Sequence, residues 1–166
     1  RKALPGDLLY LAGDRWGRTG AAIRAHYEGR SLEGFPKIRE AAFYPLPRLE
    51  LLALSGLLRG SLDSSAGLAE TLWQLSELGV RVELEVLPLY PDVLAFAGSE
   101  EAALELVLYG GEEFEAVLVV PQEGAAAVEA RAKAKGLPLF RVGRVVAGEG
   151  VYLRGAPLPR KGYAHF

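Results

Sequence analysis

Two short stretches of the sequence combine acidic residues with glycine in a pattern that could bind a phosphate group and a metal ion. The first is LDSSAGL, residues 62–68, which ends an apolar run and precedes a helix pattern. At the end of a strand the carboxylate of Asp63 could bind a cation, while the next helix start offers N–H groups to a phosphate. Asp63, Ser65 and the possible phosphate-facing Gly67 are therefore candidate site residues.

The second stretch is YGGEEFE, residues 109–115. Its two glycines, Gly110 and Gly111, would let the backbone approach a phosphate closely. Side chains alternate between the two faces of a strand, so Glu112 would face opposite to the other two glutamates of this stretch. The three carboxylates therefore cannot all serve one site.

Each stretch also has an ordinary structural interpretation. Asp63, Ser64 and Ser65 could cap the following helix, because side-chain oxygens of these residue types accept hydrogen bonds from the first N–H groups of a helix. The glycines of the second stretch could end a helix and be followed by solvated glutamates. The sequence leaves both interpretations open.

The remaining polar motifs give weaker evidence for a functional site. Glycines at positions 13, 17 and 20 precede a helix pattern. They could hold an anion, but their spacing matches neither the dinucleotide nor the P-loop motif, and a tight turn is the simpler explanation. His26 and His165 lie far apart without metal-ligand spacing, which favours surface or packing roles. No GxSxG or HExxH motif supports a hydrolase.

Strand and helix patterns alternate along the chain, which predicts an α/β or α+β fold: one domain over residues 1–166 with a mixed β-sheet and packed helices. Strands are expected at residues 7–13, 61–65, 80–89, 113–121 and 139–155, the last segment forming a strand pair with a turn at 147–150. Helices are expected at residues 21–28, 47–58, 66–79, 100–111 and 124–136.

Composition narrows the class of protein. A formal net charge of −2 without a basic block argues against nucleic-acid binding. There is no apolar run long enough for a membrane span and no signal-peptide pattern, so a cytoplasmic protein is expected. The absence of cysteine and methionine suits a heat-adapted protein. Because the chain begins with Arg1, we expect a trimmed chain or one half of a longer protein.

Taken in order, the motifs resemble the C-terminal half of thiamine-monophosphate kinase. This family belongs to a superfamily with aminoimidazole ribonucleotide synthetase, selenophosphate synthetase and the hydrogenase maturation protein HypE. KALPGDLLYLAG resembles the strand that opens this half of the kinase, and YPLPRLEL resembles its P-x-PR segment. LDSSAGL is similar to D-x-SDGL, YGGEEFEAVLVVP to GGEDYEL…vP, and the terminal KGYAHF to GYDHF. The similarity is collinear from Lys2 to Phe166.

The resemblance implies ATP-dependent phosphoryl transfer to thiamine phosphate, assisted by Mg²⁺. By position in the motifs, it implies that Asp63 is a Mg²⁺ ligand and Ser65 contacts ATP. It also implies that Glu112 and Tyr163 contact the thiamine part of the substrate, with Arg160 as a further candidate lining the same pocket.

Three departures from the family pattern affect acidic positions. Ala66 replaces a second motif aspartate, and a methyl group cannot coordinate a cation. Glu113 and Phe114 replace the aspartate and tyrosine of GGEDYE, and Ala164 replaces the aspartate of the tail. The loss of acids in two separate motifs, at Ala66 and Ala164, suggests either a slow kinase or a relative that kept the fold and lost the reaction.

The family's N-terminal half, which carries most Mg²⁺-binding aspartates, much of the ATP site and the usual dimer interface, has no counterpart in these residues. We therefore expect the isolated chain to be inactive without that N-terminal domain, and a homodimer is possible. The alternative is a non-catalytic relative that binds a nucleotide, thiamine phosphate or a protein partner. A third hypothesis keeps the superfamily but changes the substrate, and the GYAHF tail argues against it.

Overall fold

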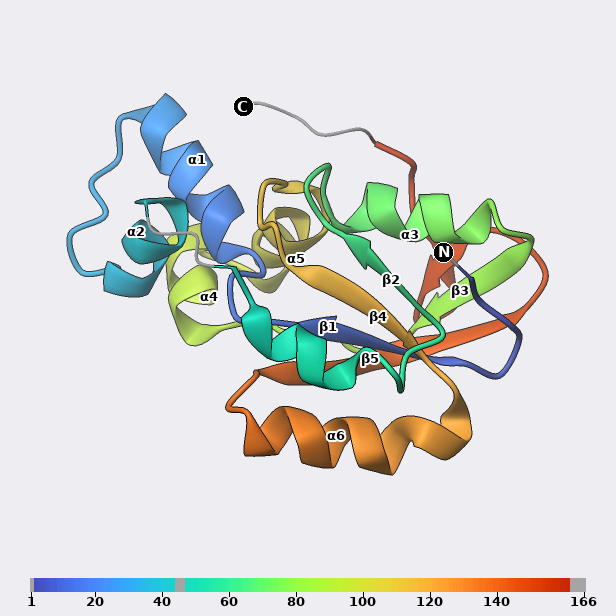
Figure 1. Cartoon of the computed structure of the whole chain (residues 1–166). Coiled ribbons are helices and arrows are strands. Elements are labelled where there is room, and N and C mark those ends of the chain that lie inside the picture. Colours follow the sequence, from blue (N-terminus) through green and yellow to red (C-terminus); the bar gives the residue numbers. More distant parts are fainter. Residues whose placement is uncertain (1, 44–46, 162–166) are drawn as a thin grey trace.

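The computed structural model describes residues 2–43 and 47–161, which form a seven-stranded mixed β-sheet with helices against it (Figure 1). The strand order is β2-β4-β1-β5-β3-β6-β7; every neighbouring pair is antiparallel except β3 and β6, which are parallel. The expected mixed sheet is therefore confirmed. The strands are β1 (Leu8–Ala12), β2 (Gly60–Asp63), β3 (Val80–Leu84), β4 (Ala116–Val120), β5 (Leu139–Ala147), β6 (Val151–Leu153) and β7 (Ala156–Pro157).

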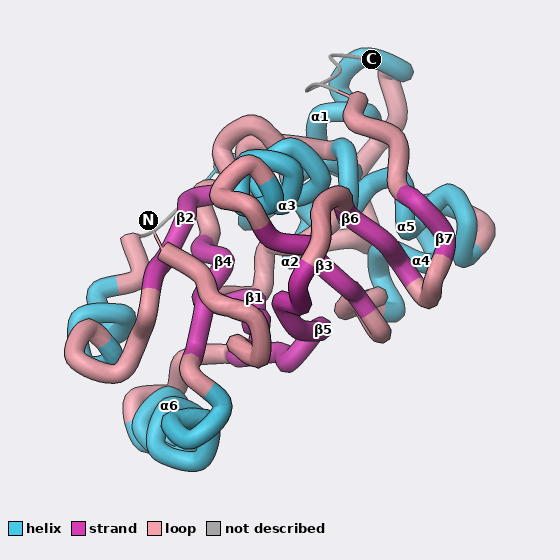
Figure 2. Tube along the Cα trace, turned by 90° about the vertical axis from the view of Figure 1, so that its right-hand side faces the viewer, coloured by secondary structure: helices cyan, strands magenta, loops and turns pink. Residues whose placement is uncertain are grey.

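Helices cover both faces of the sheet and extend beyond one end. Helix α6 lies against one face and α3 against the other, while α1, α2 and α4 gather at the end where α5 also packs (Figure 1). Figure 2 shows β2 and β7 at opposite edges of the sheet. The α-helices are α1 (Arg18–Glu28), α2 (Pro36–Phe43), α3 (Leu68–Ser76), α4 (Pro91–Ala97), α5 (Glu100–Tyr109) and α6 (Ala125–Ala134), with 3₁₀ helices η1 (Leu49–Leu54) and η2 (Gln122–Gly124).

The alternating side chains of the central strands divide the core into layers. Leu9 and Leu11 of β1 pack in the cluster that contains α3, whereas Leu8 and Tyr10 pack in the cluster that contains α6. Burial on both faces explains why this strand is apolar throughout. In β3 the buried and half-buried positions alternate, as its sequence pattern predicts.

Two expectations about secondary structure are wrong, and two helices were not expected. The helix expected at 47–58 is the short 3₁₀ helix η1, with Leu49 and Leu52 largely exposed. The strand pair expected at 139–155 is not a hairpin, because β5 and β6 both pair with β3 instead of with each other. The sequence patterns did not predict α2 and α4, because helices of only 8 and 7 residues have too few turns to show a clear helical repeat. Their apolar residues pack with those of α1 and α5.

None of the helices within residues 2–43 and 47–161 is long and apolar enough to cross a membrane.

Candidate functional site

The candidate site begins where β2 ends, with an exposed acid followed by a tight turn. Asp63 is the last residue of β2, and its Oδ1 accepts hydrogen bonds from the Ser65 backbone N–H (3.1 Å) and hydroxyl (2.7 Å). Both side chains are exposed while Ser64 between them is buried. The turn therefore presents a carboxylate and a hydroxyl side by side on the surface.

The interpretation of this stretch as a helix cap is wrong. Helix α3 has Gly67 at its N-cap position, with φ 98°, and no side chain makes a capping hydrogen bond there. A positive φ favours glycine, which explains why a glycine occupies this position after the turn. Thr71 connects the helix to the turn instead, since its hydroxyl lies 2.8 Å from the Gly67 carbonyl and 3.2 Å from the Asp63 carbonyl.

The fold brings the second motif against the first. The Glu112 backbone N–H donates a 3.0 Å hydrogen bond to the Ser65 carbonyl. A Cβ added at Gly67 would lie 3.8 Å from the Gly111 nitrogen, so the two glycine-containing segments run side by side. The predicted site residues of both motifs therefore meet at one place, although they are separated by more than forty positions in the sequence.

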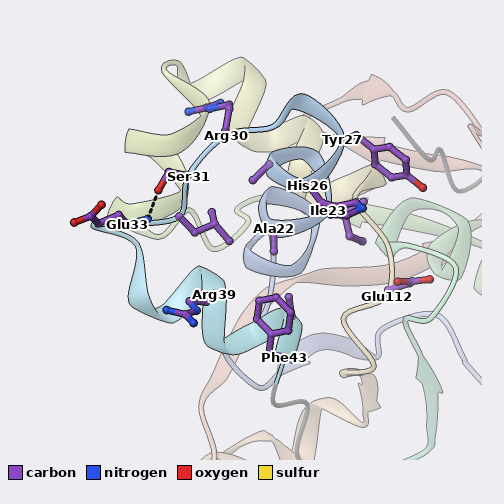
Figure 3. A pocket seen from close by; sticks show the side chains of 13 residues that line it. Ala22, Ile23, His26, Tyr27, Arg30, Ser31, Glu33, Arg39, Phe43 and Glu112 are labelled. Atoms are coloured by element: carbon purple, nitrogen blue, oxygen red, sulfur yellow. Dashed lines mark hydrogen bonds between the residues drawn. The ribbon is translucent and has the colours of Figure 1, made fainter.

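A cleft of about 740 Å³ adjoins this place, between α1 and α2 (Figure 3). Its walls include Ile23 and Tyr27 of α1 and Phe43 of α2, and Glu112 reaches it from the loop after α5. His26 also lines the cleft and stacks edge-on against Tyr27. The cleft thus combines apolar and aromatic walls with charged side chains of both signs, among them Glu112 and Arg39.

The three glutamates of the second motif have different environments. Glu112 is exposed, but Glu113 and Glu115 are buried, so the expectation of solvated glutamates after the helix is wrong for these two residues. The exposure of Glu112 and the burial of the other two match the expected pattern, but the cause is not strand alternation, because Glu112 and Phe114 have positive φ angles and β4 begins only at Ala116.

Buried Glu115 is held by two arginines that sequence reasoning did not assign to the site. Arg48 binds both of its carboxylate oxygens at 3.0 Å, and Arg15 contacts it at 3.1 Å. Arg48 also pairs with Asp14. Hydrogen bonds to Glu115 raise the pKa of the Arg48 guanidinium further above its ordinary value. Because the Glu115 carbonyl accepts from the Ser64 N–H at 2.9 Å, this ion cluster directly supports the turn of the first motif.

Close packing accounts for some of the glycines. A Cβ added at Gly20 of α1 would lie 2.8 Å from the Gly110 Cα, so α1 and the end of α5 meet backbone to backbone. A Cβ at Gly13 would overlap the Glu115 carboxylate. The contact with α1 is enough to explain why position 110 is a glycine. The predicted role of Gly110 in facing a phosphate therefore stays a prediction.

Replacing Gly20 with alanine is expected to lower the free energy of unfolding by about 1–3 kcal/mol, because the added methyl group forces the two backbones apart. Denaturant unfolding measures this effect. Gly56→Ala is the matched control, since its added Cβ would meet nothing within 4 Å. Equal stability of the two variants would contradict the proposed close approach of the helices.

The last described residues run along helix α3 and contact the end of α5. Arg160 donates to Glu70 in the first turn of α3 at 2.8 Å and also pairs with Glu77 at the end of that helix. The Tyr109 hydroxyl donates to the Pro159 carbonyl at 2.9 Å. Tyr163, Ala164 and His165 lie outside the described residues, so the role predicted for Tyr163 stays a prediction.

The described residues do not form a complete metal site by themselves: no group of three or more His, Cys, Asp or Glu among them could hold a metal ion. Asp63 nevertheless has suitable chemistry for Mg²⁺, because it is an exposed carboxylate at a strand end. Mg²⁺ commonly binds through one or two carboxylates together with waters and substrate phosphates. Asp63 therefore fits as one ligand, and any further protein ligands would have to come from outside these residues.

The chain is similar to known proteins over most of its length. A family model described as AIR synthase related protein, C-terminal domain, matches residues 5–156. The chain belongs to this family. Among its members, the thiamine-monophosphate kinase of Pyrococcus horikoshii is 30% identical over 156 residues, which cover 92% of this chain and 46% of the relative. The chain thus spans about half the length of the curated relatives it matches.

Solved structures of other proteins share the fold. The crystal structure of tt0281 from Thermus thermophilus has 96% sequence identity and a TM-score of 0.95, covering 96% of this chain and 53% of that chain. AaThiL, complexed with AMPPCP and TMP, has 24% identity and a TM-score of 0.80, covering 99% of this chain and 52% of that chain. Together with the family model and the curated relatives, these structures confirm the resemblance to the C-terminal half of thiamine-monophosphate kinase.

Proposed function

We propose that this chain is the C-terminal domain of a thiamine-monophosphate kinase, which transfers the γ-phosphoryl group of ATP to thiamine phosphate with the help of Mg²⁺. It would act together with an N-terminal domain that these residues do not include. The main support is the meeting of Asp63, Ser65 and Glu112 at one exposed place beside the cleft. The complex of AaThiL with AMPPCP and TMP gives independent support for nucleotide binding by such a fold.

Each candidate residue has a chemical task in this proposal. Asp63 would hold Mg²⁺, which when bound offsets the negative charge of the phosphates. The Ser65 hydroxyl, now bonded to Asp63, would turn to donate to ATP. Glu112 would bind the thiamine part at the cleft, where its carboxylate attracts the positively charged thiazolium ring. The protein would thus act mainly by positioning two anionic reactants.

One observation favours a second function. Ala66 is half-buried in the turn, where the family has an aspartate, and its methyl group cannot coordinate a cation. A relative that binds nucleotide or thiamine phosphate without transferring phosphate would keep Asp63, Ser65 and Glu112 while losing this acid. The two functions differ in whether thiamine diphosphate is produced.

The proposed site can be tested in a full-length chimera, in which this chain replaces the matching part of the Thermus thermophilus protein to which it is 96% identical. Glu112→Gln in this chimera is expected to raise the KM for thiamine phosphate about 10-fold, because a charge-assisted contact is lost, with little change in the KM for ATP. Glu123→Gln, an exposed change in η2, is the control. An equal KM for thiamine phosphate in the two variants would show that Glu112 does not bind this substrate.

A further inference from the structure

Two fully buried side chains connect the motif loops from the inside. Ser64 belongs to the first loop (residues 63–67) and Glu113 to the second loop (residues 110–115), and neither is exposed to solvent. Their side chains are 3.2 Å apart, at hydrogen-bond distance. The exposed residues Asp63, Ser65 and Glu112 flank this buried pair in the sequence.

The Glu113 carboxyl has an environment that favours its neutral form. Among the described residues its Oε1 has no hydrogen-bond partner. Burial raises the pKa of Glu113 to about 8, and nearby Glu115 adds to this shift, while Ser64 and Arg15 oppose it. The protonated carboxyl and the serine hydroxyl can therefore share one hydrogen bond without placing a charge in the core.

The backbone around Glu113 is held in an uncommon conformation. Its two neighbours, Glu112 and Phe114, have φ angles of 55° and 51°, in the left-handed region that residues other than glycine seldom adopt. Such a conformation persists only where surrounding contacts impose it. Three hydrogen bonds join this segment to the first loop: the buried side-chain bond from Ser64 to Glu113, the Glu112–Ser65 backbone bond and the bond from the Ser64 N–H to the Glu115 carbonyl.

We propose that Glu113 is a positioning residue, whose buried hydrogen bond to Ser64 sets the place of Glu112 relative to Asp63 and Ser65. As a functional statement this rests on the proposed function, because it concerns the distance between the substrate-binding and metal-binding loops. Glu113 itself touches neither reactant in this proposal, since it has no exposed surface. Misplacement of reacting groups by about 1 Å can cost about 100-fold in rate.

Amide hydrogen exchange on this chain tests the connection directly. The reporters are the N–H groups of Ser64 and Glu112, which bond to the Glu115 and Ser65 carbonyls. Glu113→Leu should lower protection at both amides about 10-fold or more, as expected for loss of one hydrogen bond, whereas Glu113→Gln should stay within about threefold of the original. Unchanged protection in Glu113→Leu would overturn the proposal, and so would a Gln variant that behaves like Leu.

A matched pair of serine variants decides the question if Glu113→Leu does not fold. Ser64→Ala removes the other end of the bond and should loosen the same two amides. Ser76→Ala is the control: this buried hydroxyl at the far end of α3 accepts from the Gly150 N–H at 2.8 Å, so its loss should affect Gly150 and leave the motif loops protected. The proposal would be wrong if the amides of residues 64 and 112 were as well protected in Ser64→Ala as they are in Ser76→Ala.

The pH profile distinguishes positioning by a neutral carboxyl from simple packing. Because the pKa of Glu113 is raised in the fold, protection at the two amides should be complete at lower pH and fall as the pH rises through about 8. The profile should be flat in Glu113→Gln. A wild-type profile that matches Glu113→Gln would contradict the neutral bridge.

Steady-state kinetics of the full-length chimera test whether this connection affects the reaction. Glu113→Leu should lower kcat about 10- to 100-fold with a KM for ATP within about threefold, and Gln should restore kcat. An unchanged kcat would overturn the positioning role. A chimera without any activity, even before substitution, would count against the proposed function, while the amide protections would still decide whether Glu113 joins the loops.

Discussion

Replacing Glu115 with glutamine is expected to lower the free energy of unfolding by about 3–5 kcal/mol, the usual cost of removing one partner from a buried ion cluster. The Glu115 side chain has no exposed surface and accepts from both Arg48 and Arg15. Without the charge of Glu115, the Arg15 side chain, only 7% exposed, loses one of its partners in the core. Denaturant unfolding of this chain provides the measurement.

The same variant should disturb the candidate site, because the Glu115 carbonyl accepts a hydrogen bond from the N–H of Ser64, the residue after Asp63. Glu149→Gln, an exposed change in the turn between β5 and β6, is a matched control and should leave stability within about 0.5 kcal/mol. A Glu115→Gln variant as stable as this control would show that the cluster contributes little to the fold.

Replacing Asp63 with asparagine is expected to lower kcat/KM of the full-length chimera by about 100-fold or more, because an amide holds a metal ion less strongly than a carboxylate does. The change preserves size and still allows the side-chain oxygen to accept from the Ser65 N–H. Steady-state assays at several Mg²⁺ concentrations measure it, and excess Mg²⁺ should recover part of the activity.

The stability of the chain gives the control for this variant. Asp63 is exposed, so Asp63→Asn should unfold at nearly the same denaturant concentration as the original. Full activity of Asp63→Asn at low Mg²⁺ would exclude Asp63 as the metal ligand, whereas a loss of activity together with lost stability would point to a structural role.

The sequence predicted the parts of the fold that depend on local patterns. The alternation at Val80–Leu84 and the helix pattern at Glu100–Tyr109 each match an observed element. Pairings over long distances could not be predicted from such patterns. The glycine-rich turn after β5 looks like a hairpin, but its two strands flank β3, since only the assembled sheet determines which edges pair.

The exposed residues of the candidate site could be predicted from the sequence, and its buried residues could not. Motif similarity identified Asp63, Ser65 and Glu112, which the fold brings together. The partners of Glu115 are invisible to local reasoning, because Arg48 lies 67 positions away and only tertiary structure joins them. A glutamate placed directly before an apolar strand was the one sequence signal that could have suggested a buried charge at this position.

The most direct test of the proposed function is formation of thiamine diphosphate from ATP and thiamine phosphate by the full-length chimera, measured alongside its Ala66→Asp variant. The proposal predicts Mg²⁺-dependent product in the chimera and a faster rate in the variant, because the added carboxylate supplies a further metal ligand. Product from the variant alone would indicate a site that lost activity at this position. No product from either protein, with both folded and the unmodified Thermus protein active under the same conditions, would contradict the assignment of this chain to the kinase reaction.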